Sequence, residues 1–398
     1  MAPSEKRLAP DCAEIDMGLV EAEWPASQRD GIYFNSGSCG VKPLCVLNAI
    51  EQGYRRLNAN PTIMTFVEHE IWNETREQAR HLFGASEDTL FLTQNSTFGI
   101  QLIMQSFLKN AGDEFVTTDQ EHNCVKTLSR FLEERKGIVS KRSTVDPHGG
   151  SEKLCLDLLN LVGPKTKLVL VSQINCLNGW RPKLDLLDLE LKRAGIPLLV
   201  DGAHAPGQGP LSISQYPLWV ASGHKWMGAP NGTGFLHVDP SYMDRLEPVT
   251  IGDRFFDATG QFSDRHKFEW PGTSDPVKWL GLQAALRLQE SLRPQAIATR
   301  QKYLNKYLRE ALASRFRNAE LLTPDADDEI CGMVAVRFRD DKLRSKDLRA
   351  ELWKKHRIWV QPDFSSEQPG AGMRLSCHPF VQEPDIEKLA SALTQLIN

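Results

Sequence analysis

The sequence lacks an apolar run long enough to cross a membrane. A transmembrane helix requires about 20 consecutive apolar residues, and no such stretch occurs among the 398 residues. Residues 1–7 also contain no apolar segment, so they predict neither a secretion signal nor a membrane anchor. We therefore expect a cytoplasmic protein with no membrane partner.

Paired cysteines are also missing. The cysteines form no Cys-x-x-Cys pair, and their spacings match no zinc-binding pattern. In a chain of this size, scattered cysteines indicate reduced, mostly buried thiols rather than a disulfide framework. They are Cys12, Cys39, Cys45, Cys124, Cys155, Cys176, Cys331 and Cys377. We predict no metal site.

An excess of positive charge is the third absence. The chain has 47 basic and 51 acidic residues, a formal net charge of −4, and no basic stripe is evident. Nucleic acid is therefore not an expected partner. The chain does have length and apolar content, because 398 residues with 41% hydrophobic side chains are enough for one large and one smaller domain.

Short apolar runs alternate with amphipathic stretches through much of the chain. Strands are predicted at 90–93, 114–117, 168–172, 197–201 and 218–221, and helices at 123–136, 152–161 and 184–194. This alternation predicts an α/β fold built from βαβ units, with a mostly parallel sheet covered by helices on both faces.

The pattern changes towards the C-terminus. Two longer helices are predicted at 280–292 and 296–316, followed by elements at 330–338, 346–356, 373–377 and 384–397. We predict an N-terminal segment over residues 1–32, a large domain over 33–290 and a smaller α+β domain over 291–398.

Lys225 is the first candidate for chemistry. It lies in Ser222-Gly223-His224-Lys225-Trp226, between apolar runs at 218–221 and 234–238, which predicts a strand, a tight loop and a second strand. A lysine on a loop where glycine lets the backbone come close differs from an ordinary surface lysine. Its amine is a candidate for Schiff-base formation.

Asp201 is the second candidate. It ends the apolar run 197–201, which predicts a carboxylate at the carboxyl edge of a parallel sheet, where open α/β sheets bind ligands. Alone, Asp201 would be interpreted as a helix N-cap. Beside Lys225, it is better interpreted as the anion that keeps the ring nitrogen of a pyridine cofactor protonated.

These residues resemble the motifs of the class V aminotransferase superfamily, in its isopenicillin N epimerase-like and cysteine desulfurase-like branch. The resemblance extends from about Tyr33 to the C-terminus. It implies the PLP-dependent transferase fold of type I, with pyridoxal 5'-phosphate (PLP) as the cofactor. The matching segments are Val200-Asp201-Gly202-Ala203-His204-Ala205-Pro206-Gly207, Ser222-Gly223-His224-Lys225-Trp226, Glu269-Trp270-Pro271-Gly272-Thr273-Ser274-Asp275 and Met373-Arg374-Leu375-Ser376.

The resemblance implies roles around the cofactor ring. Lys225, Asp201 and His122 would be catalytic, with the His122 ring stacked on the pyridine. His204 would reach the ring hydroxyl. At Gln173 this sequence departs from its relatives, many of which carry histidine there.

The phosphate end of the cofactor is expected at the helix that begins after strand 90–93. Ser96 and Thr97 open this helix, and a helix N-terminus offers free N–H groups and a favourable dipole to an anion. The alternative is that Ser96 or Thr97 only caps the helix. The resemblance favours phosphate binding and adds Ser222 and His224 to the site.

Arg374 is the expected anchor for the substrate. A guanidinium binds a carboxylate with two parallel hydrogen bonds, and an unpaired charge in a short apolar strand would be costly. An internal salt bridge is the alternative. The resemblance places Arg374 on the carboxylate of an amino-acid substrate and Asn175 near it.

Thr273 carries a prediction about assembly. In the family that the sequence resembles, the Gly272-Thr273 pair reaches the neighbouring subunit's active site and helps to hold the phosphate. This implies a homodimer with shared sites. The alternative is a simple turn after Trp270-Pro271.

The sequence leaves the reaction open. A lysine amine can remove and return the α proton of an amino acid, so an epimerase or racemase and a β-eliminating carbon–sulfur lyase are both possible. A true aminotransferase and a non-catalytic protein of the same fold are further alternatives. Desulfurases of this superfamily need a cysteine shortly before the substrate arginine, and residues 360–373 contain none. Cys39 and Cys377 lie elsewhere, so persulfide chemistry is disfavoured.

Overall fold

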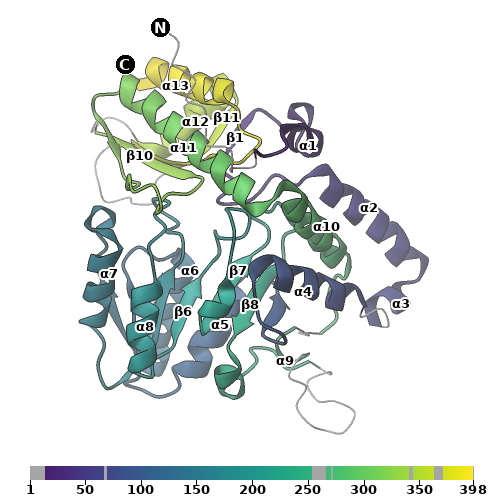
Figure 1. Ribbon diagram of the computed structural model, residues 1–398, viewed down its shortest axis with the longest axis vertical. Helices are drawn as coiled ribbons and strands as arrows, with labels where there is room; N and C mark the ends of the chain where they lie inside the picture. The colour runs from purple at the N-terminus through teal and green to yellow at the C-terminus, as the bar shows by residue number, and fades with distance from the viewer. Residues whose placement is uncertain are drawn as a thin grey trace.

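The computed structural model describes residues 14–66, 70–252, 266–269, 272–339, 344–362 and 371–397. Trp270, Pro271 and residues 363–370 of the interval before Arg374 lie outside these ranges. Two sheets organise the chain, and the smaller one sits at one end of the larger (Figure 1). The helices are α1 (Met17–Glu23), α2 (Leu44–Ala59), α3 (Pro61–Phe66), α4 (Glu70–Phe83), α5 (Ser96–Phe107), α6 (Asn123–Lys136), α7 (Gly150–Leu159), α8 (Asp185–Arg193), α9 (His266–Glu269), α10 (Val277–Leu292), α11 (Pro294–Arg315), α12 (Ser345–His356) and α13 (Glu383–Ile397).

The larger sheet has seven strands in the order β2-β8-β7-β6-β5-β3-β4. Its strands are β2 (Leu90–Thr93), β3 (Glu114–Thr118), β4 (Val139–Ser143), β5 (Thr166–Ser172), β6 (Leu198–Asp201), β7 (Leu218–Ser222) and β8 (Gly234–Val238). Neighbours from β7 to β4 pair in parallel, and β8 alone runs antiparallel to both of its neighbours. The predicted α/β class with a mostly parallel sheet is therefore confirmed.

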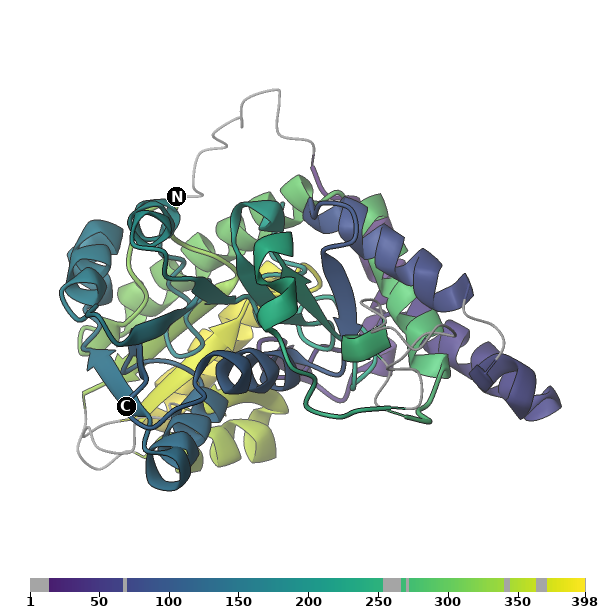
Figure 2. The same ribbon diagram turned by 90° about the horizontal axis from the view of Figure 1, so that it is seen from below.

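Apart from the edge strand β4, most strands of this sheet are apolar on both faces, as expected for strands that helices cover on both sides. Leu198 and Val200 of β6 pack into a core with α7 and α8, whereas Leu199 between them packs into a second core with α5 and α6. Successive side chains of a strand point to opposite faces. Figure 2 shows α7 and α8 on one side of the large sheet and α5 and α6 on the other.

The smaller sheet has the order β1-β11-β12-β10-β9. Its strands are β1 (Ile32–Phe34), β9 (Ala319–Leu321), β10 (Met333–Phe338), β11 (Ile358–Pro362) and β12 (Ala371–Ser376). It forms a core with α11, α12 and α13 to which Val20 and Trp24 also contribute. The predicted domain division remains a prediction, but β1 straddles its boundary between residues 32 and 33, and the N-terminal residues pack with the smaller domain.

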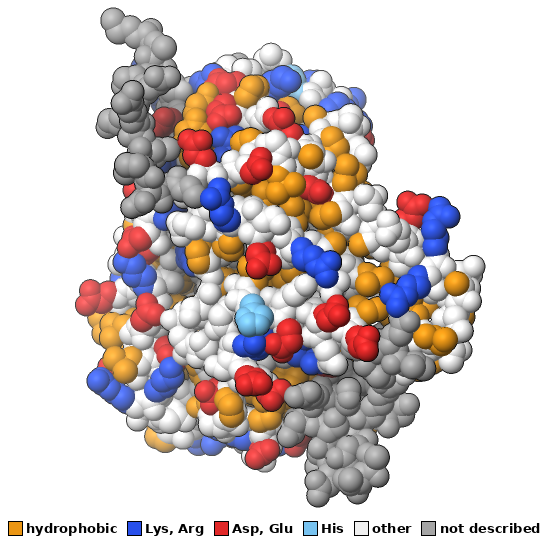
Figure 3. Space-filling model, turned by 45° about the vertical axis from the view of Figure 1, so that its right-hand side comes forward, with side chains coloured by type: hydrophobic (Ala, Val, Ile, Leu, Met, Phe, Trp, Pro, Cys, Tyr) orange, Lys and Arg blue, Asp and Glu red, His pale blue; other side chains and the backbone are white. Residues whose placement is uncertain are grey.

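The surface agrees with the charge balance of the sequence. On the face drawn in Figure 3, acidic and basic side chains are interspersed and no continuous basic stripe runs across it. None of the helices in the described ranges is long and apolar enough to cross a bilayer.

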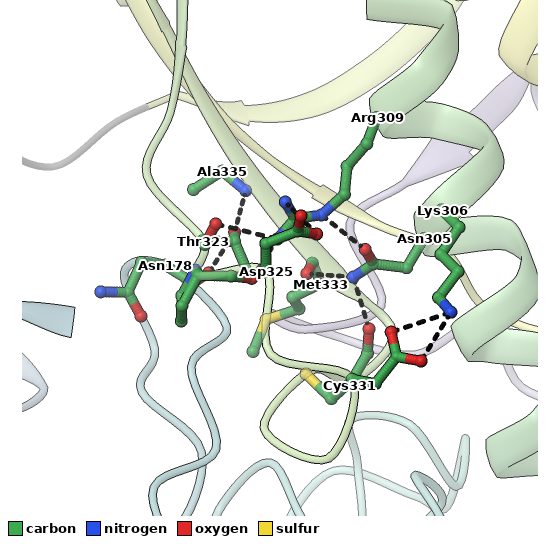
Figure 4. Close-up of polar contacts among 11 residues, drawn as sticks. Asn178, Asn305, Lys306, Arg309, Thr323, Asp325, Cys331, Met333 and Ala335 are labelled. Carbon is green, nitrogen blue, oxygen red and sulfur yellow. Dashed lines mark hydrogen bonds and ion pairs between the residues drawn. The ribbon is translucent and has the colours of Figure 1, made fainter. Parts of the chain in front are cut away.

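A buried polar cluster joins the smaller domain to the loop after β5 (Figure 4). The Arg309 guanidinium donates to Asn305 Oδ1 at 2.9 Å and to the carbonyl of Thr323 at 2.8 Å. The Thr323 hydroxyl donates to the carbonyl of Asn178 and accepts the N–H of Ala335 at 2.8 Å. Because buried carbonyl groups need donors, Arg309 holds the turn that positions Thr323 against the large domain.

We predict that Arg309→Met lowers the free energy of unfolding by about 2 to 4 kcal/mol, because the stem is kept while several buried acceptors lose their donor. Asp325→Ala is the matched control. Asp325 pairs with Arg309 at 3.4 Å, but its side chain is 93% exposed, so its loss should cost under about 0.5 kcal/mol. Urea unfolding of both variants measures the difference, and equal effects would show that the surface ion pair matters instead.

Candidate active site

A cavity of about 340 Å³ opens where the carboxyl ends of β5, β6 and β7 face β12 of the smaller sheet. This is the edge at which parallel sheets bind ligands. The lining residues are Gly37, Ser38, Asn95, Ser96, Thr97, His122, Ser172, Ile174, Cys176, Asp201, Ala203, His204, Ser222, His224, Lys225 and Arg374. The cavity thus brings together all of the sequence-predicted site residues except Asn175 and Thr273.

Asp201 ends β6 and is 4% exposed. One of its carboxylate oxygens accepts the N–H of Ala203 at 2.9 Å. No helix follows directly, since residues 202–212 form turns, so the alternative of a helix N-cap is wrong. Burial raises the pKa of Asp201, whereas the Ala203 hydrogen bond and Lys225 lower it. Among the described lining residues, Asp201 alone carries a carboxylate.

Lys225 lies on the loop between β7 and β8, as the spacing predicts. Its Nζ is 3.0 Å from His204 Nε2. Burial lowers the pKa of Lys225, Asp201 raises it, and the Arg374 cation lowers it. The geometry therefore presents a half-buried amine whose neutral form is favoured relative to an exposed lysine.

Two further histidines in the cavity are held neutral. His122 is exposed and caps α6, because its Nδ1 accepts the N–H of Cys124 at 3.2 Å. Partial desolvation of its ring lowers the pKa of His122 to about 4, and the charges of Lys225 and Arg374 act in the same direction. Burial likewise lowers the pKa of His224 to about 4, with help from Lys225 and Lys42. Both rings therefore remain uncharged at neutral pH and present polar atoms without adding positive charge.

The N-terminus of α5 faces the same cavity. The helix is capped by Asn95, whose side chain accepts the N–H of Phe98 at 2.9 Å. The alternative that Ser96 or Thr97 is the cap is therefore wrong. The Ser222 hydroxyl donates to Ser96 Oγ and accepts the Ser96 N–H, both at 3.1 Å. Hydroxyl groups and a helix N-terminus together form an environment suited to an anion.

Arg374 on β12 is buried, at 4% exposed. Its guanidinium donates to the carbonyl of Cys176 at 2.6 Å and to Ser38 Oγ at 2.8 Å. No carboxylate in the described ranges lies within ion-pair distance, and Nε has no hydrogen-bond partner among those residues. Within the described residues, Arg374 therefore forms no internal salt bridge.

Asn175 lies just behind the cavity wall. Its Oδ1 accepts the N–H of Leu177 at 2.8 Å, and its Nδ2 donates to Gln120 at 3.3 Å. Asn175 thus holds the turn that presents the Cys176 carbonyl to Arg374. Gln173, where the sequence departs from the family pattern, is also hydrogen-bonded. Its Oε1 accepts the indole N–H of Trp219 at 2.9 Å.

Thr273 is exposed and lies outside the cavity of its own chain. Its predicted role in a neighbouring subunit stays a prediction.

Several residues of the site were not among the predicted site residues, although the resemblance implies that residues 35–40 line the substrate entrance. Gly37 and Ser38, which follow β1, and Cys176 line the cavity, and burial raises the pKa of the Cys176 thiol to about 11. Glu121 is buried next to the lining residue Ser172. Burial raises the pKa of Glu121 to about 7, although its hydrogen bonds with Ser172 and Thr118 lower it. Two of these residues had a signal in the sequence, because Glu121 is adjacent to His122 and Cys176 is adjacent to Asn175.

The cysteines considered from the sequence stand apart from this chemistry. Cys377 is fully buried, and neither it nor Cys39 lines the cavity; the Sγ of Cys39 is 3.7 Å from Asn231 Oδ1. No cluster of potential metal ligands occurs in the described part of the chain.

Comparisons with known proteins show which family and fold the chain shares. Residues 32–389 match the family model for aminotransferase class-V. The chain is 30% identical to isopenicillin N epimerase of Streptomyces clavuligerus over 389 residues, which are 92% of this chain and 94% of the relative. It is 29% identical to a probable cysteine desulfurase of Xylella fastidiosa (strain 9a5c), over 75% of each chain. A solved structure of mutant C-DES with glycine covalently linked to its PLP cofactor has a TM-score of 0.84 at 24% identity, covering 94% of this chain and 98% of that one. The predicted fold of type I is confirmed.

Proposed function

The chain belongs to the class-V aminotransferase family of PLP-dependent enzymes, and from this premise we propose that it epimerises or racemises the α carbon of an amino acid. The observation that carries the proposal is the convergence of Lys225, Asp201 and Arg374 on one cavity. The 30% identity to isopenicillin N epimerase across 92% of the chain supports an isomerase. A non-catalytic role is disfavoured because all three functional groups are intact.

The phosphate end of PLP fits the α5 end of the cavity. Ser96 and Thr97 supply hydroxyl groups at a helix N-terminus, which favours a bound anion. Ser222 adds a third hydroxyl. The Nδ1 atom of His224 is buried and has no hydrogen-bond partner among the described residues. We propose that these four residues hold the phosphate.

The ring end of PLP fits the opposite side of the cavity. Asp201 supplies the buried carboxylate that a protonated pyridine nitrogen requires, and Lys225 supplies the amine that binds the cofactor aldehyde. We propose that His122 stacks on the ring and that His204 donates to the ring hydroxyl. The neutral state of both histidines supports these roles, because neither adds a charge beside Asp201 and Lys225.

Lys225 is also the proposed base at the α carbon. Bound PLP withdraws electrons from the α carbon of an attached amino acid, which makes the α proton acidic. Once the incoming amino acid has displaced it from the cofactor, Lys225 would take this proton as a neutral amine, and inversion requires that a proton then reach the opposite face of the α carbon. The lowered pKa of Lys225 supports this role, because a larger fraction of the amine is free of its proton at neutral pH.

Arg374 is the proposed binding group for the α-carboxylate of the substrate. Its guanidinium is buried and lacks a carboxylate partner in the described ranges, and a bound carboxylate would supply the missing anion. Asn175 is proposed to support this contact by holding the Cys176 turn against Arg374. The partner is thus a small amino-acid molecule.

The alternative reaction is β-elimination by a carbon–sulfur lyase or desulfurase-like enzyme. The similarity to cysteine desulfurases and to the fold of C-DES is the reason to test this reaction. The absence of cysteine from residues 360–373 disfavours the persulfide route. Epimerisation and elimination leave different products, which one experiment separates.

We predict that the purified protein, incubated with a panel of amino acids in deuterated water, exchanges the α proton of its substrate and forms the opposite enantiomer. The carbon skeleton should survive, so no stoichiometric keto acid or sulfide should appear. Proton NMR and chiral chromatography follow the products. Release of keto acid or sulfide in step with substrate loss would replace the epimerase proposal with the lyase.

Borohydride reduction followed by peptide mapping provides the matched control for this experiment. The pyridoxyl group should be found on Lys225, and Lys225→Ala should lose exchange. Lys278 is the comparison, because burial also lowers its pKa although it does not line the cavity. Lys278→Ala should keep both label and exchange, and a label on Lys278 would refute the assignment of Lys225.

We also propose a homodimer in which Thr273 completes the partner's phosphate site. Thr273 is exposed and outside its own cavity. An apolar groove between α5 and α6 adjoins Thr97 and includes Phe131, whose side chain is 49% exposed. A second subunit covering this groove would bring its own loops next to the phosphate end. The unpaired described cysteines support a reducing, cytoplasmic location for this assembly.

Mixing two inactive variants tests the shared site. A heterodimer of Lys225→Ala with Thr273→Ala should contain one wholly wild-type site, so α-proton exchange should return when the subunits exchange. Mass spectrometry of differently tagged chains verifies the exchange. Activity that stays absent in proven heterodimers, given that Thr273→Ala alone is impaired, would contradict the model.

A further inference from the structure

His204 lies between two groups that limit how its ring can be protonated. Its Nδ1 is 3.3 Å from the indole nitrogen Nε1 of Trp226, and its Nε2 is 3.0 Å from Lys225 Nζ. His204 is 3% exposed, and the indole of Trp226 is fully buried. Within the described part of the chain, the ring therefore has one polar neighbour on each side.

The Trp226 neighbour decides the tautomer. An indole N–H donates a hydrogen bond and cannot accept one, so His204 Nδ1 must be the acceptor and carries no proton. A neutral imidazole carries its one proton on the other nitrogen. Before Lys225 binds the cofactor, this Nε2–H points at Lys225, where it can only donate to the lone pair of a neutral amine; with PLP bound, the same N–H would be the one that donates to the ring hydroxyl.

We propose that Trp226 is a positioning residue that fixes His204 in the Nε2–H tautomer and thereby favours the neutral amine of Lys225. The inference rests on the proposed role of Lys225 as the cofactor-binding amine. Trp226 acts through His204 and touches neither the reacting atoms nor the cofactor. The proposal extends the proposed function, because it gives the indole N–H of Trp226 a role in setting the protonation state of Lys225.

Trp226 is held firmly enough for this role. Its ring stacks on His378 with centroids 6.4 Å apart and an angle of 10° between the planes. Its carbonyl oxygen is 3.1 Å from His378 Nε2. The backbone of His204 is fixed as well, because its carbonyl accepts from Gln208 Nε2 at 2.8 Å. The indole of Trp226 and the backbone of His204 are therefore both held in place.

The charges around His204 also favour the neutral ring. Burial lowers the pKa of His204, and the positive charges nearby act in the same direction. The titratable or charged groups that act on His204 or on Lys225 are Asp201, Arg374, His122, His224, Cys124 and Cys176. The carboxylate of Asp201 acts on Lys225 and raises its pKa, so the hydrogen bond from Nε2–H opposes Asp201 in setting the state of the amine.

Nitrogen NMR of protein labelled with ¹⁵N-histidine tests the tautomer directly. The His204 signals, assigned by their loss in His204→Gln, should show a bare Nδ1 and a protonated Nε2, with and without bound PLP. Trp226→Phe should lose this single pattern. A protonated Nδ1 in the wild-type protein would overturn the proposal even if the variant failed to fold.

The state of Lys225 is tested by the pH dependence with which cofactor-free protein recaptures PLP. Loss of the Nε2–H donor removes a stabiliser of the neutral amine, so the apparent pKa of Lys225 should rise by about one unit in Trp226→Phe. Trp219→Phe is the matched control. Trp219 is also fully buried and donates its indole N–H, but to Gln173, so the pKa of Lys225 should not change.

Two outcomes separate the positioning role from the proposed function. If Trp226→Phe leaves the pKa unchanged while the pyridoxyl label stays on Lys225, the positioning role falls and the proposed function stands. A label on another lysine would instead refute the proposed function and leave the tautomer result untouched.

Discussion

The Arg374 guanidinium is buried between the two domains and is held by neutral acceptors. Its strand belongs to the smaller sheet, while its hydrogen bonds reach the Cys176 carbonyl of the large domain and the Ser38 hydroxyl of the loop after β1. A buried cation without an anion is unfavourable, so the fold must keep these three segments together. Their meeting point forms the wall of the cavity, and the site therefore depends on how the domains are joined.

The positive charge of Arg374 also shapes the chemistry of the cavity. It acts with Lys225 and with burial to keep the nearby histidines neutral, and it leaves Asp201 as the carboxylate that balances the site. Neutral rings can then donate or accept hydrogen bonds without repelling a protonated cofactor ring. In the proposed function, Arg374 would bind the substrate, Asp201 would face the ring nitrogen and Lys225 would bind the aldehyde, and these three roles suit reactions at an α carbon.

Much of the large domain could be predicted from the sequence because its signals are local. Asp201 and Lys225 follow buried apolar runs that are strands in the structure. The edge strand β4 was missed because Lys141 and Arg142 interrupt its apolar pattern. The contact of Arg374 with Cys176 could not be predicted, since it joins residues 198 positions apart. For the same reason, local patterns placed β1 at a boundary, whereas its hydrogen bonds are made with β11.

Arg374 is proposed to bind the carboxylate of the substrate. A cycle of binding measurements with two ligands and two proteins tests this contact directly. The amino acid with the fastest α-proton exchange and its decarboxylated amine are titrated into wild-type protein and Arg374→Gln, with the cofactor spectrum reporting binding. Loss of a charge-assisted pair of about 3 kcal/mol predicts that wild type prefers the amino acid by roughly 100-fold. Arg374→Gln should show almost no preference. An equal preference in both proteins, with folding and cofactor content intact, would contradict the account.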